Sequence, residues 1–499
     1  MRRREWMKAA AGTLLAPFAW AEEEGIPAHP NDLEFPKLSY DPPKPADYRH
    51  ELPGGAVAYV VEDHQLPLID ISVTIRTGGY LVPREKAGLA TFTGSQIRAG
   101  GTKTIPAHEF DEQAAFLASR ISSNIGGTSA TAALNCITQN LQPTLKLFFD
   151  ILKNPGFDPE RLRLAAARRL QTMQRRNDRA QGVEQREFAR LMRGDEHYST
   201  WQTTKASVEG VTVDAMREFH ASYYHPGSMI FAVAGDVETQ EILEQLGGEL
   251  TEGWPTQSKP EVAAVPVPKH EPSAGVYMVD KPELNQSRIA MGHLGIRRDD
   301  PDRIAIGIMD HILGSSGFTS RIMMRVRSDE GLAYSAGSRF RPGIYYPGTF
   351  RAGFQSMNAR CAQAATIVLE ELARIREEKV TEEELATAKN ASIETFPRFF
   401  ATAGAVARTF VSDEYTDREE GYWDKYRDRI AAVTRDDVLR VAQKHLHPDK
   451  LSILGVGNVQ EMLAGNPDKP DYQFSKLAGG SEIQRIPLPD PLTMEYPEA

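Results

Sequence analysis

The chain has 499 residues, of which 41% are hydrophobic and 25% charged, so it can bury a sizeable core. Its formal net charge of -10 at pH 7 argues against a nucleic-acid-binding protein, because such proteins usually carry a basic surplus. Only Cys136 and Cys361 could form a disulfide. Because a large domain needs no such link, we interpret both cysteines as small buried hydrophobic residues.

The N-terminus has the pattern of an export signal. Arg2–Arg4 precede a modestly apolar run, Ala9–Ala21, which is too short to cross a bilayer and ends in a small-x-small cleavage site. The stretch Arg3–Lys8 resembles a twin-arginine signal, and an ordinary secretory signal is the alternative. We therefore predict a signal peptide over residues 1–21, and a periplasmic or extracellular protein without a membrane span.

Strands and long helices follow one another in the first half of the chain. Segments rich in β-branched residues predict the strands, which are Val57–Val61, Ile69–Ile75, two segments around Gly126-Gly127 within 117–137, and Met229–Ala234. Apolar residues at helical spacing predict the helices, which are Glu85–Ile97, much of 160–193, and a helix that begins at Thr212.

An internal repeat organises the chain. VTVDAMREFHASYYHPGSMIFAVAGDV, from Val211, aligns without a gap with VTRDDVLRVAQKHLHPDKLSILGVGNV, from Val433. In each copy a threonine is the expected N-cap of a helix, a His-Pro step ends that helix, and a strand follows. A repeat with so long a period indicates two copies of a whole domain.

The second copy has the same character. Its expected strands lie near 286–294, 332–340 and 451–454, and its expected helices near 302–313, 320–330, 359–378 and 381–412. Runs of strands and then of helices indicate an α+β fold. The predicted domain order is a signal peptide (1–21), an extended N-terminal arm (22–47), an N-terminal domain (48–251), a proline-rich linker (252–274), a C-terminal domain (275–465) and a C-terminal tail (466–499).

Several segments resemble one known family. VVEDHQLPLIDISVTIRTGGYLVPREKAGLATFTGSQIRAGGTKT (60–104) and ILKNPGFDPERL (151–162) look like parts of an insulinase/pitrilysin-type domain, and HILGSSGFTSRIMMRVRSDEGLAYS (311–335) resembles the other half of such proteins. The resemblance covers roughly residues 48–462. It implies two homologous domains, each an antiparallel-rich sheet flanked by helices, and kinship with zinc metallopeptidases of the inverzincin type.

The resemblance also identifies a degenerate zinc motif. Active members carry H-x-x-E-H on the helix that corresponds to Glu85–Ile97; the two histidines bind zinc and the glutamate acts as general base. Here Thr91 and Ser95 occupy the ligand positions, Gly94 the base position, and Thr172 the position of the third ligand. Hydroxyls are poor zinc ligands, so we expect no metal in this chain and no peptidase activity of the chain alone.

Another constellation of the family is retained. In its two-chain enzymes, the zinc-free partner supplies an Arg and a Tyr seven residues apart to the shared cleft. RSDEGLAY matches both residue types, as Arg327 and Tyr334. Locally, a short helix capped by Thr319 or Ser320 is expected to end at Gly331 and lead into a strand. The alternative is a surface arginine beside a half-buried strand tyrosine.

Three other features have simpler interpretations. The arginine-rich stretch Arg161–Arg193 is interpreted first as a solvated, partly paired helix face, and second as a wall of a cleft or of a partner interface. The Leu313–Gly317 turn lacks the Lys-Ser/Thr of a P-loop and is interpreted as a tight turn. His445 and His447 stand at a helix end, and we interpret both as structural.

The resemblance implies the non-zinc subunit of an exported heterodimeric metallopeptidase. In this hypothesis an H-x-x-E-H partner subunit holds the zinc, and this chain binds the peptide and supplies Arg327 and Tyr334 to carbonyl stabilisation. The alternative is a structural or peptide-binding homologue without a catalytic contribution.

Overall fold

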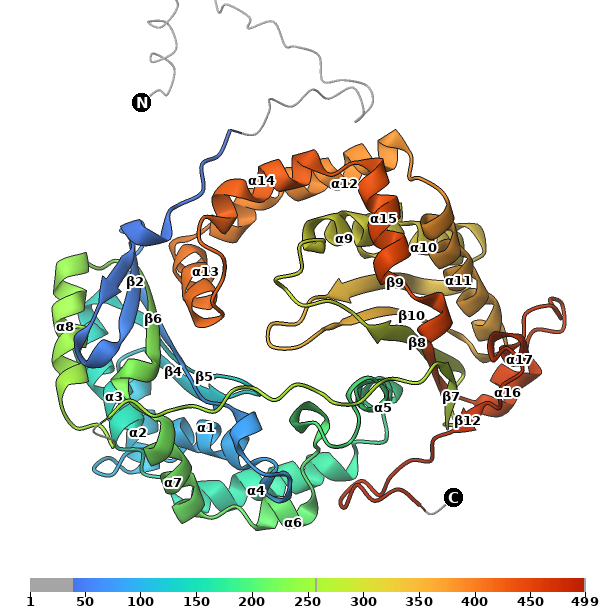
Figure 1. Cartoon of the computed structure of the whole chain (residues 1–499). Coiled ribbons are helices and arrows are strands. Elements are labelled where there is room, and N and C mark those ends of the chain that lie inside the picture. Colours follow the sequence, from blue (N-terminus) through green and yellow to red (C-terminus); the bar gives the residue numbers. More distant parts are fainter. Residues whose placement is uncertain (1–38, 256–257, 498–499) are drawn as a thin grey trace, which may run out of the picture. The chain divides into compact units, whose positions relative to one another are not determined.

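The two copies of the repeat build two six-stranded sheets with equivalent strand orders (Figure 1). The computed structural model describes residues 39–255 and 258–497, so the predicted signal peptide and most of the predicted arm lie outside the described residues. From Asp41 onward the chain forms one compact unit.

The first sheet has the order β1-β2-β6-β3-β5-β4 and the second has the order β12-β7-β11-β8-β10-β9. The strands of the first sheet are β1 (Arg49–Glu51), β2 (Val57–Glu62), β3 (Leu68–Ile75), β4 (Arg120–Ile125), β5 (Ala130–Ile137) and β6 (Met229–Gly235). Those of the second are β7 (Gly275–Asp280), β8 (Gln286–Leu294), β9 (Ala333–Arg341), β10 (Thr349–Met357), β11 (Ser452–Gly457) and β12 (Gln484–Arg485). Most neighbours are antiparallel; β2–β6, β7–β11 and β7–β12 are parallel. The α+β prediction with two homologous domains is confirmed.

Helices flank both sheets. Those of the first half are α1 (Leu89–Ala99), α2 (Ala107–Phe116), α3 (Leu141–Lys153), α4 (Pro159–Gln174), α5 (Ala180–Arg193), α6 (Lys205–Glu209), α7 (Val213–Tyr223) and α8 (Thr239–Thr251). Those of the second half are α9 (Arg303–Asp310), α10 (Arg321–Met323), α11 (Cys361–Glu377), α12 (Glu382–Glu394), α13 (Ala403–Tyr415), α14 (Tyr422–Ala432), α15 (Arg435–His445), α16 (Val459–Ala464) and α17 (Phe474–Leu477). Between α8 and β7 the described linker forms no helix or strand.

The repeated helix begins in the same way in both copies. Thr212 accepts a hydrogen bond from the backbone N–H of Ala215, and Thr434 accepts one from Asp437, whose carboxylate returns to the Thr434 N–H as a capping box. These bonds satisfy N–H groups that the first turn of a helix leaves unpaired. The two predicted N-caps are therefore confirmed.

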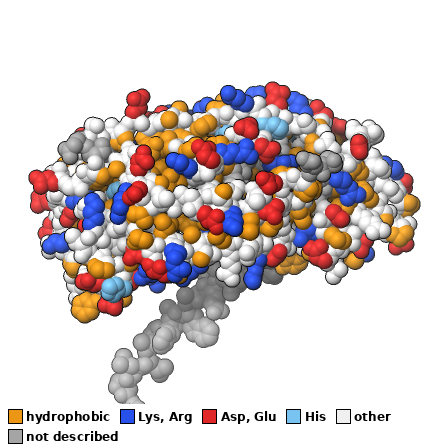
Figure 2. Space-filling model, turned by 90° about the horizontal axis from the view of Figure 1, so that it is seen from below, with side chains coloured by type: hydrophobic (Ala, Val, Ile, Leu, Met, Phe, Trp, Pro, Cys, Tyr) orange, Lys and Arg blue, Asp and Glu red, His pale blue; other side chains and the backbone are white. Residues whose placement is uncertain are grey.

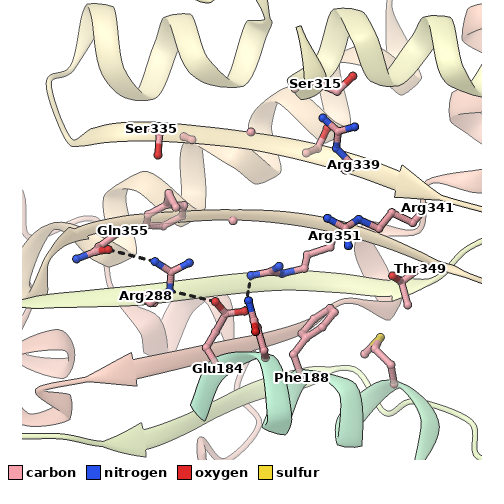
Figure 3. Close-up of a pocket in the computed structure, with 18 of the residues that line it drawn as sticks. Glu184, Phe188, Arg288, Ser315, Ser335, Arg339, Arg341, Thr349, Arg351 and Gln355 are labelled. Atoms are coloured by element: carbon pink, nitrogen blue, oxygen red, sulfur yellow. Dashed lines mark hydrogen bonds and ion pairs between the residues drawn. The ribbon is translucent and has the colours of Figure 1, made fainter. Parts of the chain in front are cut away.

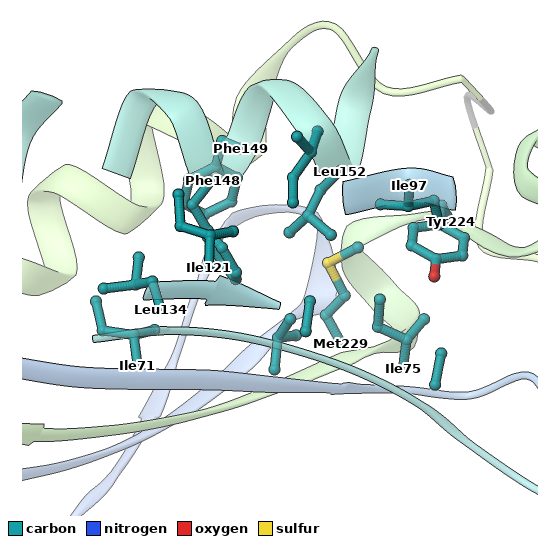
Figure 4. Packing of buried hydrophobic residues seen from close by; sticks show 14 of the residues in the cluster. Ile71, Ile75, Ile97, Ile121, Leu134, Phe148, Phe149, Leu152, Tyr224 and Met229 are labelled. Carbon is teal, nitrogen blue, oxygen red and sulfur yellow. The ribbon is translucent and has the colours of Figure 1, made fainter. Parts of the chain in front are cut away.

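Each sheet has its own apolar core. In the first half, isoleucines and leucines of β3 and β5 meet Phe148, Phe149 and Leu152 of α3 (Figure 4). Cys136 on β5 and Cys361 at the start of α11 are both buried and free, as predicted. No helix among the described residues is long and apolar enough to cross a membrane.

The halves exchange equivalent helices. α5, from the first half, packs on β8 and β11 of the second sheet, where Val183, Phe188 and Met192 join a separate apolar cluster. α13, from the second half, packs on β2 and β6 of the first sheet, and its Phe410 contacts the ring of Tyr59. Figure 1 shows both helices beside the sheet of the opposite half. This exchange ties the two copies into one unit.

Four expected helices differ from the structure. The helix expected at Glu85–Ile97 begins only at Leu89, because Gly88 precedes it with a φ of 106°. The helical stretch 160–193 is interrupted between α4 and α5, and that at 381–412 between α12 and α13, where Pro397 cannot continue a helix. Near 320–330 only three residues are α-helical, and a π-helical turn, Met324–Asp329, follows them. The sequence did not predict strands β1, β7, β10 and β12.

Candidate functional site

Packing closes the position that the family resemblance assigns to the general base. Gly94 is buried on α1 where that helix crosses β4. A Cβ added to Gly94 would lie 2.2 Å from the backbone nitrogen of Ile125 and 2.7 Å from the carbonyl carbon of Asn124. Both are backbone atoms, which cannot swing aside as a side chain can. A glutamate at this position would therefore require α1 and β4 to separate.

The ligand positions do not fit zinc either. Thr91 and Ser95 are exposed on α1, and the Ser95 hydroxyl donates to the carbonyl of Phe92 at 2.9 Å. Thr172 on α4 is also exposed and donates to the carbonyl of Arg168 at 2.9 Å. Zinc sites in proteins use imidazole, thiolate or carboxylate ligands. The three hydroxyls offer none of these, and those of Ser95 and Thr172 already donate within their own helices, so the residues present do not suit a catalytic zinc.

Arg327 and Tyr334 lie together on the surface. The Arg327 guanidinium carbon stands 4.6 Å from the ring centre of Tyr334 and 4.5 Å from that of Phe318. Both rings are largely exposed, with 83% of Tyr334 and 65% of Phe318 accessible. Within the described part of the chain, no carboxylate forms an ion pair with Arg327. Stacking against aromatic faces holds a guanidinium in a defined plane while its N–H donors stay available.

The local backbone fixes this arrangement. Arg327 lies in the π-helical turn Met324–Asp329, and such turns occur frequently at functional sites. The turn ends at Gly331, whose φ of 61° suits glycine, so the predicted C′ role is confirmed. Buried Val326 anchors the turn from below. Ser320 holds the N-cap position, but its hydroxyl donates to the carbonyl of Gly317 instead of capping the helix, so that part of the prediction is wrong.

A cavity of about 530 Å³ opens between α5 and the second sheet (Figure 3). Glu184 of α5 is buried there and accepts a hydrogen bond from Arg288 at 3.1 Å and another from Arg351. Arg288 also donates to Gln355 at 3.1 Å. Sequence reasoning missed this site, because nothing along the chain shows that α5 reaches the opposite sheet.

A second cavity, of about 730 Å³, adjoins the first. Arg193, Arg341 and Thr349 line both cavities, and Thr91 of the degenerate motif lines the second one. Arg169 of α4 faces this second cavity, and burial lowers its pKa. The degenerate motif and the second sheet therefore share one connected space.

Both interpretations of the arginine-rich stretch apply, to different residues. Arg161 and Arg163 form ion pairs on exposed helix faces, with Asp111 at 2.8 Å and with Glu160 at 2.5 Å. Further along the stretch, arginines line the two cavities. The interpretation as a cleft wall therefore applies to Arg169 on α4 and to Arg193 at the end of α5, which line these cavities.

The remaining motifs serve structural roles. His445 lies 2.8 Å from the carboxylate of Asp302, and the ring of His447 packs against that of His293. The Gly/Ser segment after α9 forms a π-helical turn, His311–Ser315, and it approaches β9 closely. A Cβ on Gly314 would meet the backbone nitrogen of Ser338 at 2.2 Å.

Comparisons with known proteins find similarity to peptidases and to their inactive homologues. Residues 210–392 match the family described as "Peptidase M16 inactive domain". A protein of Streptomyces coelicolor named as an uncharacterized zinc protease is 27% identical over 258 residues, which cover 50% of this chain and 55% of that protein. The chain thus spans about half the length of this relative. A Helicobacter pylori protein named as a non-peptidase homolog is 22% identical over 334 residues, 66% of this chain and 74% of its own length.

The fold is shared with solved structures. A peptidase M16 inactive domain from Pseudomonas fluorescens superimposes with a TM-score of 0.73 at 22% identity, covering 82% of this chain and 97% of that one. The predicted kinship is therefore confirmed: residues 210–392 match the peptidase M16 inactive domain, and the chain shares the fold of this solved M16 domain.

Proposed function

We propose that this chain is the non-zinc subunit of an exported two-chain M16 peptidase. It binds unfolded peptide and directs Arg327 and Tyr334 at the scissile carbonyl, while an H-x-x-E-H partner subunit contributes the zinc and the general base. The observation that carries the proposal is the half-buried Arg327 side chain, whose guanidinium stacks against two exposed aromatic rings and has no ion pair among residues 39–255 and 258–497.

The chemistry of the pair suits this role. Peptide hydrolysis develops negative charge on the carbonyl oxygen, and preorganised donors aimed at that oxygen lower the barrier. A guanidinium is permanently cationic with five N–H donors, and a phenol adds one O–H donor. An arginine meant only to stabilise the fold would more commonly pair with a nearby carboxylate, as Arg325 does with Glu371 at 3.0 Å two residues earlier.

Steady-state kinetics of the reconstituted two-chain complex test the proposal. We expect Arg327→Ala and Tyr334→Phe each to lower kcat by roughly tens to hundreds of fold, as loss of one preorganised donor typically does. Arg327→Lys should restore only part of the activity, because an ammonium does not reproduce the planar fork. Arg163→Ala, an exposed arginine on α4, is the matched control.

Gel filtration of each variant complex separates loss of chemistry from loss of assembly. If both variants assemble and retain the kcat/KM of the native complex, the pair is structural. The second candidate, a scaffold or peptide-binding homologue, then replaces the first. The name of the Helicobacter pylori relative, a non-peptidase homolog, favours this candidate.

Export is the remaining part of the proposal and depends on the N-terminal sequence alone. Cell fractionation should recover the processed chain outside the cytoplasm. Replacing Arg3 and Arg4 by lysine should block export if the twin-arginine route is used. A full-length chain that stays with a cytoplasmic marker enzyme would contradict export.

A further inference from the structure

The two adjoining cavities form one groove whose charged lining is almost entirely basic. We call it the arginine groove; its charged lining consists of Arg169, Arg193, Arg288, Arg339, Arg341 and Arg351, with Glu184 as the single acid among the described lining residues. The whole chain has a net charge of -10, so this concentration opposes the overall balance. On the face shown in Figure 2, by contrast, acidic and basic side chains are interspersed.

Four of these six arginines form no ion pair among the described residues, and two of the four, Arg339 and Arg341, lie side by side on one strand. Glu184 forms ion pairs with Arg288 and Arg351. Arg339 and Arg341 are exposed on β9, and neither forms an ion pair with any residue that the structure describes. In Figure 3, Arg288 and Arg351 converge on Glu184, whereas Arg339 and Arg341 reach no carboxylate. Both guanidinium groups are thus available to an anion from outside.

The register of the sheet adds an electrostatic cost. Arg339 on β9 is the direct cross-strand partner of Arg351 on β10. Like charges directly opposite each other destabilise a sheet, because their side chains leave the same face close together. Glu184 offsets the charge of Arg351 but not that of Arg339. An uncompensated arginine in this position is typical of a binding surface whose counter-charge arrives with a ligand.

The shape of the groove selects the ligand. Beside Arg339 and Arg351 the floor carries no side chains, because Gly337 of β9 and Gly353 of β10 stand opposite each other two residues further along the strands. Arg339 and Arg341 are separated by two residues of strand, a distance of roughly 6.6–6.8 Å. In an extended peptide, side chains at alternate positions have this same spacing.

We propose that the arginine groove binds an extended acidic peptide segment, with carboxylates at alternate positions received by Arg339 and Arg341. This inference rests on the proposed peptide-binding function and names its substrate class: unfolded chains with an Asp/Glu-rich segment. Planar guanidinium groups pair bidentately with carboxylates, so the contact is specific in its geometry as well as favourable in charge.

Fluorescence anisotropy with the full chain alone tests the inference, without a partner subunit and without hydrolysis. The probe is a fluorescein-labelled Glu-Ala repeat peptide, and the isosteric Gln-Ala peptide is its uncharged counterpart. We expect the acidic peptide to bind, the Gln-Ala peptide to bind far more weakly, and affinity to fall as salt screens the contacts. The double variant Arg339→Ala/Arg341→Ala should weaken binding roughly three- to thirtyfold.

Two further variants keep the result interpretable. Arg120→Ala removes an exposed arginine from β4, the equivalent edge strand of the first sheet, and should leave binding unchanged. Arg339→Glu places opposite charges across β9 and β10, so its Tm should equal or exceed that of the native chain while peptide binding is lost.

Three outcomes would overturn the inference. The first is equal binding of the Glu-Ala and Gln-Ala peptides, and the second is undiminished binding by Arg339→Glu. The third is tighter binding of a single-stranded oligonucleotide than of the acidic peptide, which would indicate a general polyanion site. Because the assay needs no peptidase activity, its failure is distinct from a failure of the Arg327 and Tyr334 kinetics.

Discussion

Gly94→Ala is the sharpest test of why α1 cannot hold the catalytic glutamate. In an exposed helix interior, replacing glycine by alanine stabilises by about 1 kcal/mol. At Gly94 the new Cβ would lie 2.2 Å from the nitrogen of Ile125 and 2.8 Å from its Cγ1, so α1 and β4 must move apart. Overpacking of this kind costs about 1–3 kcal/mol, and more when backbone has to shift. We therefore expect a net destabilisation of about 1–2 kcal/mol.

Gly307→Ala provides the matched control. Gly307 also lies inside a helix, α9, but nothing lies within 4 Å of the position of its added Cβ. The same substitution should therefore stabilise by up to about 1 kcal/mol. The assay is thermal unfolding followed by circular dichroism, with both variants compared under one set of conditions. If the Tm of Gly94→Ala equals or exceeds that of the native chain, there is room for a side chain at position 94. Packing would then not explain why a glutamate is absent there.

Two further predictions concern buried charge and pH. Glu184→Gln should loosen the packing of α5 on the second sheet and lower the free energy of unfolding by up to about 3 kcal/mol. The reason is that Arg288 and Arg351 lose their common counter-charge while they remain only partly solvated. In the same unfolding assay, Asp178→Asn at an exposed position should change little. Burial lowers the pKa of His220 to about 4, against the opposing effect of its bond to the Leu152 carbonyl. The unfolded chain therefore binds the proton first as pH falls from about 6.5 to 4, and the folded state loses up to about 3 kcal/mol across that window. His220→Gln should reduce this pH dependence of Tm, and an unchanged pH profile would refute the assignment.

Local patterns predicted the elements that carry the repeat. The N-caps at Thr212 and Thr434 form as expected, and β8, expected at 286–294, spans those residues. Predictions failed where a local signal was misread or weak: Pro397 interrupts the helix expected at 381–412, and β10 was missed although apolar and polar residues alternate along it.

For the site, spacing indicated that Arg327 and Tyr334 could meet, because a short turn and the following strand place them on one surface. Phe318 could not be predicted as the second ring against Arg327. The contact between Phe318 and Arg327 depends on how the backbone folds between the two residues. That segment includes part of a π-helical turn, which has no reliable sequence signature.

The sequence by itself predicted the two-copy architecture, and it is the basis of the two hypotheses of a degenerate zinc motif and of a functional Arg327 and Tyr334, because these depend on residue identity and short spacing. Tertiary structure alone decided that α5 and α13 cross to opposite sheets, that Gly94 has no room for a side chain, and that arginines distant in the chain converge on one groove. The physical reason is that helix and strand periodicity specify which face of an element is apolar. They do not specify which of two equivalent sheets that face will cover.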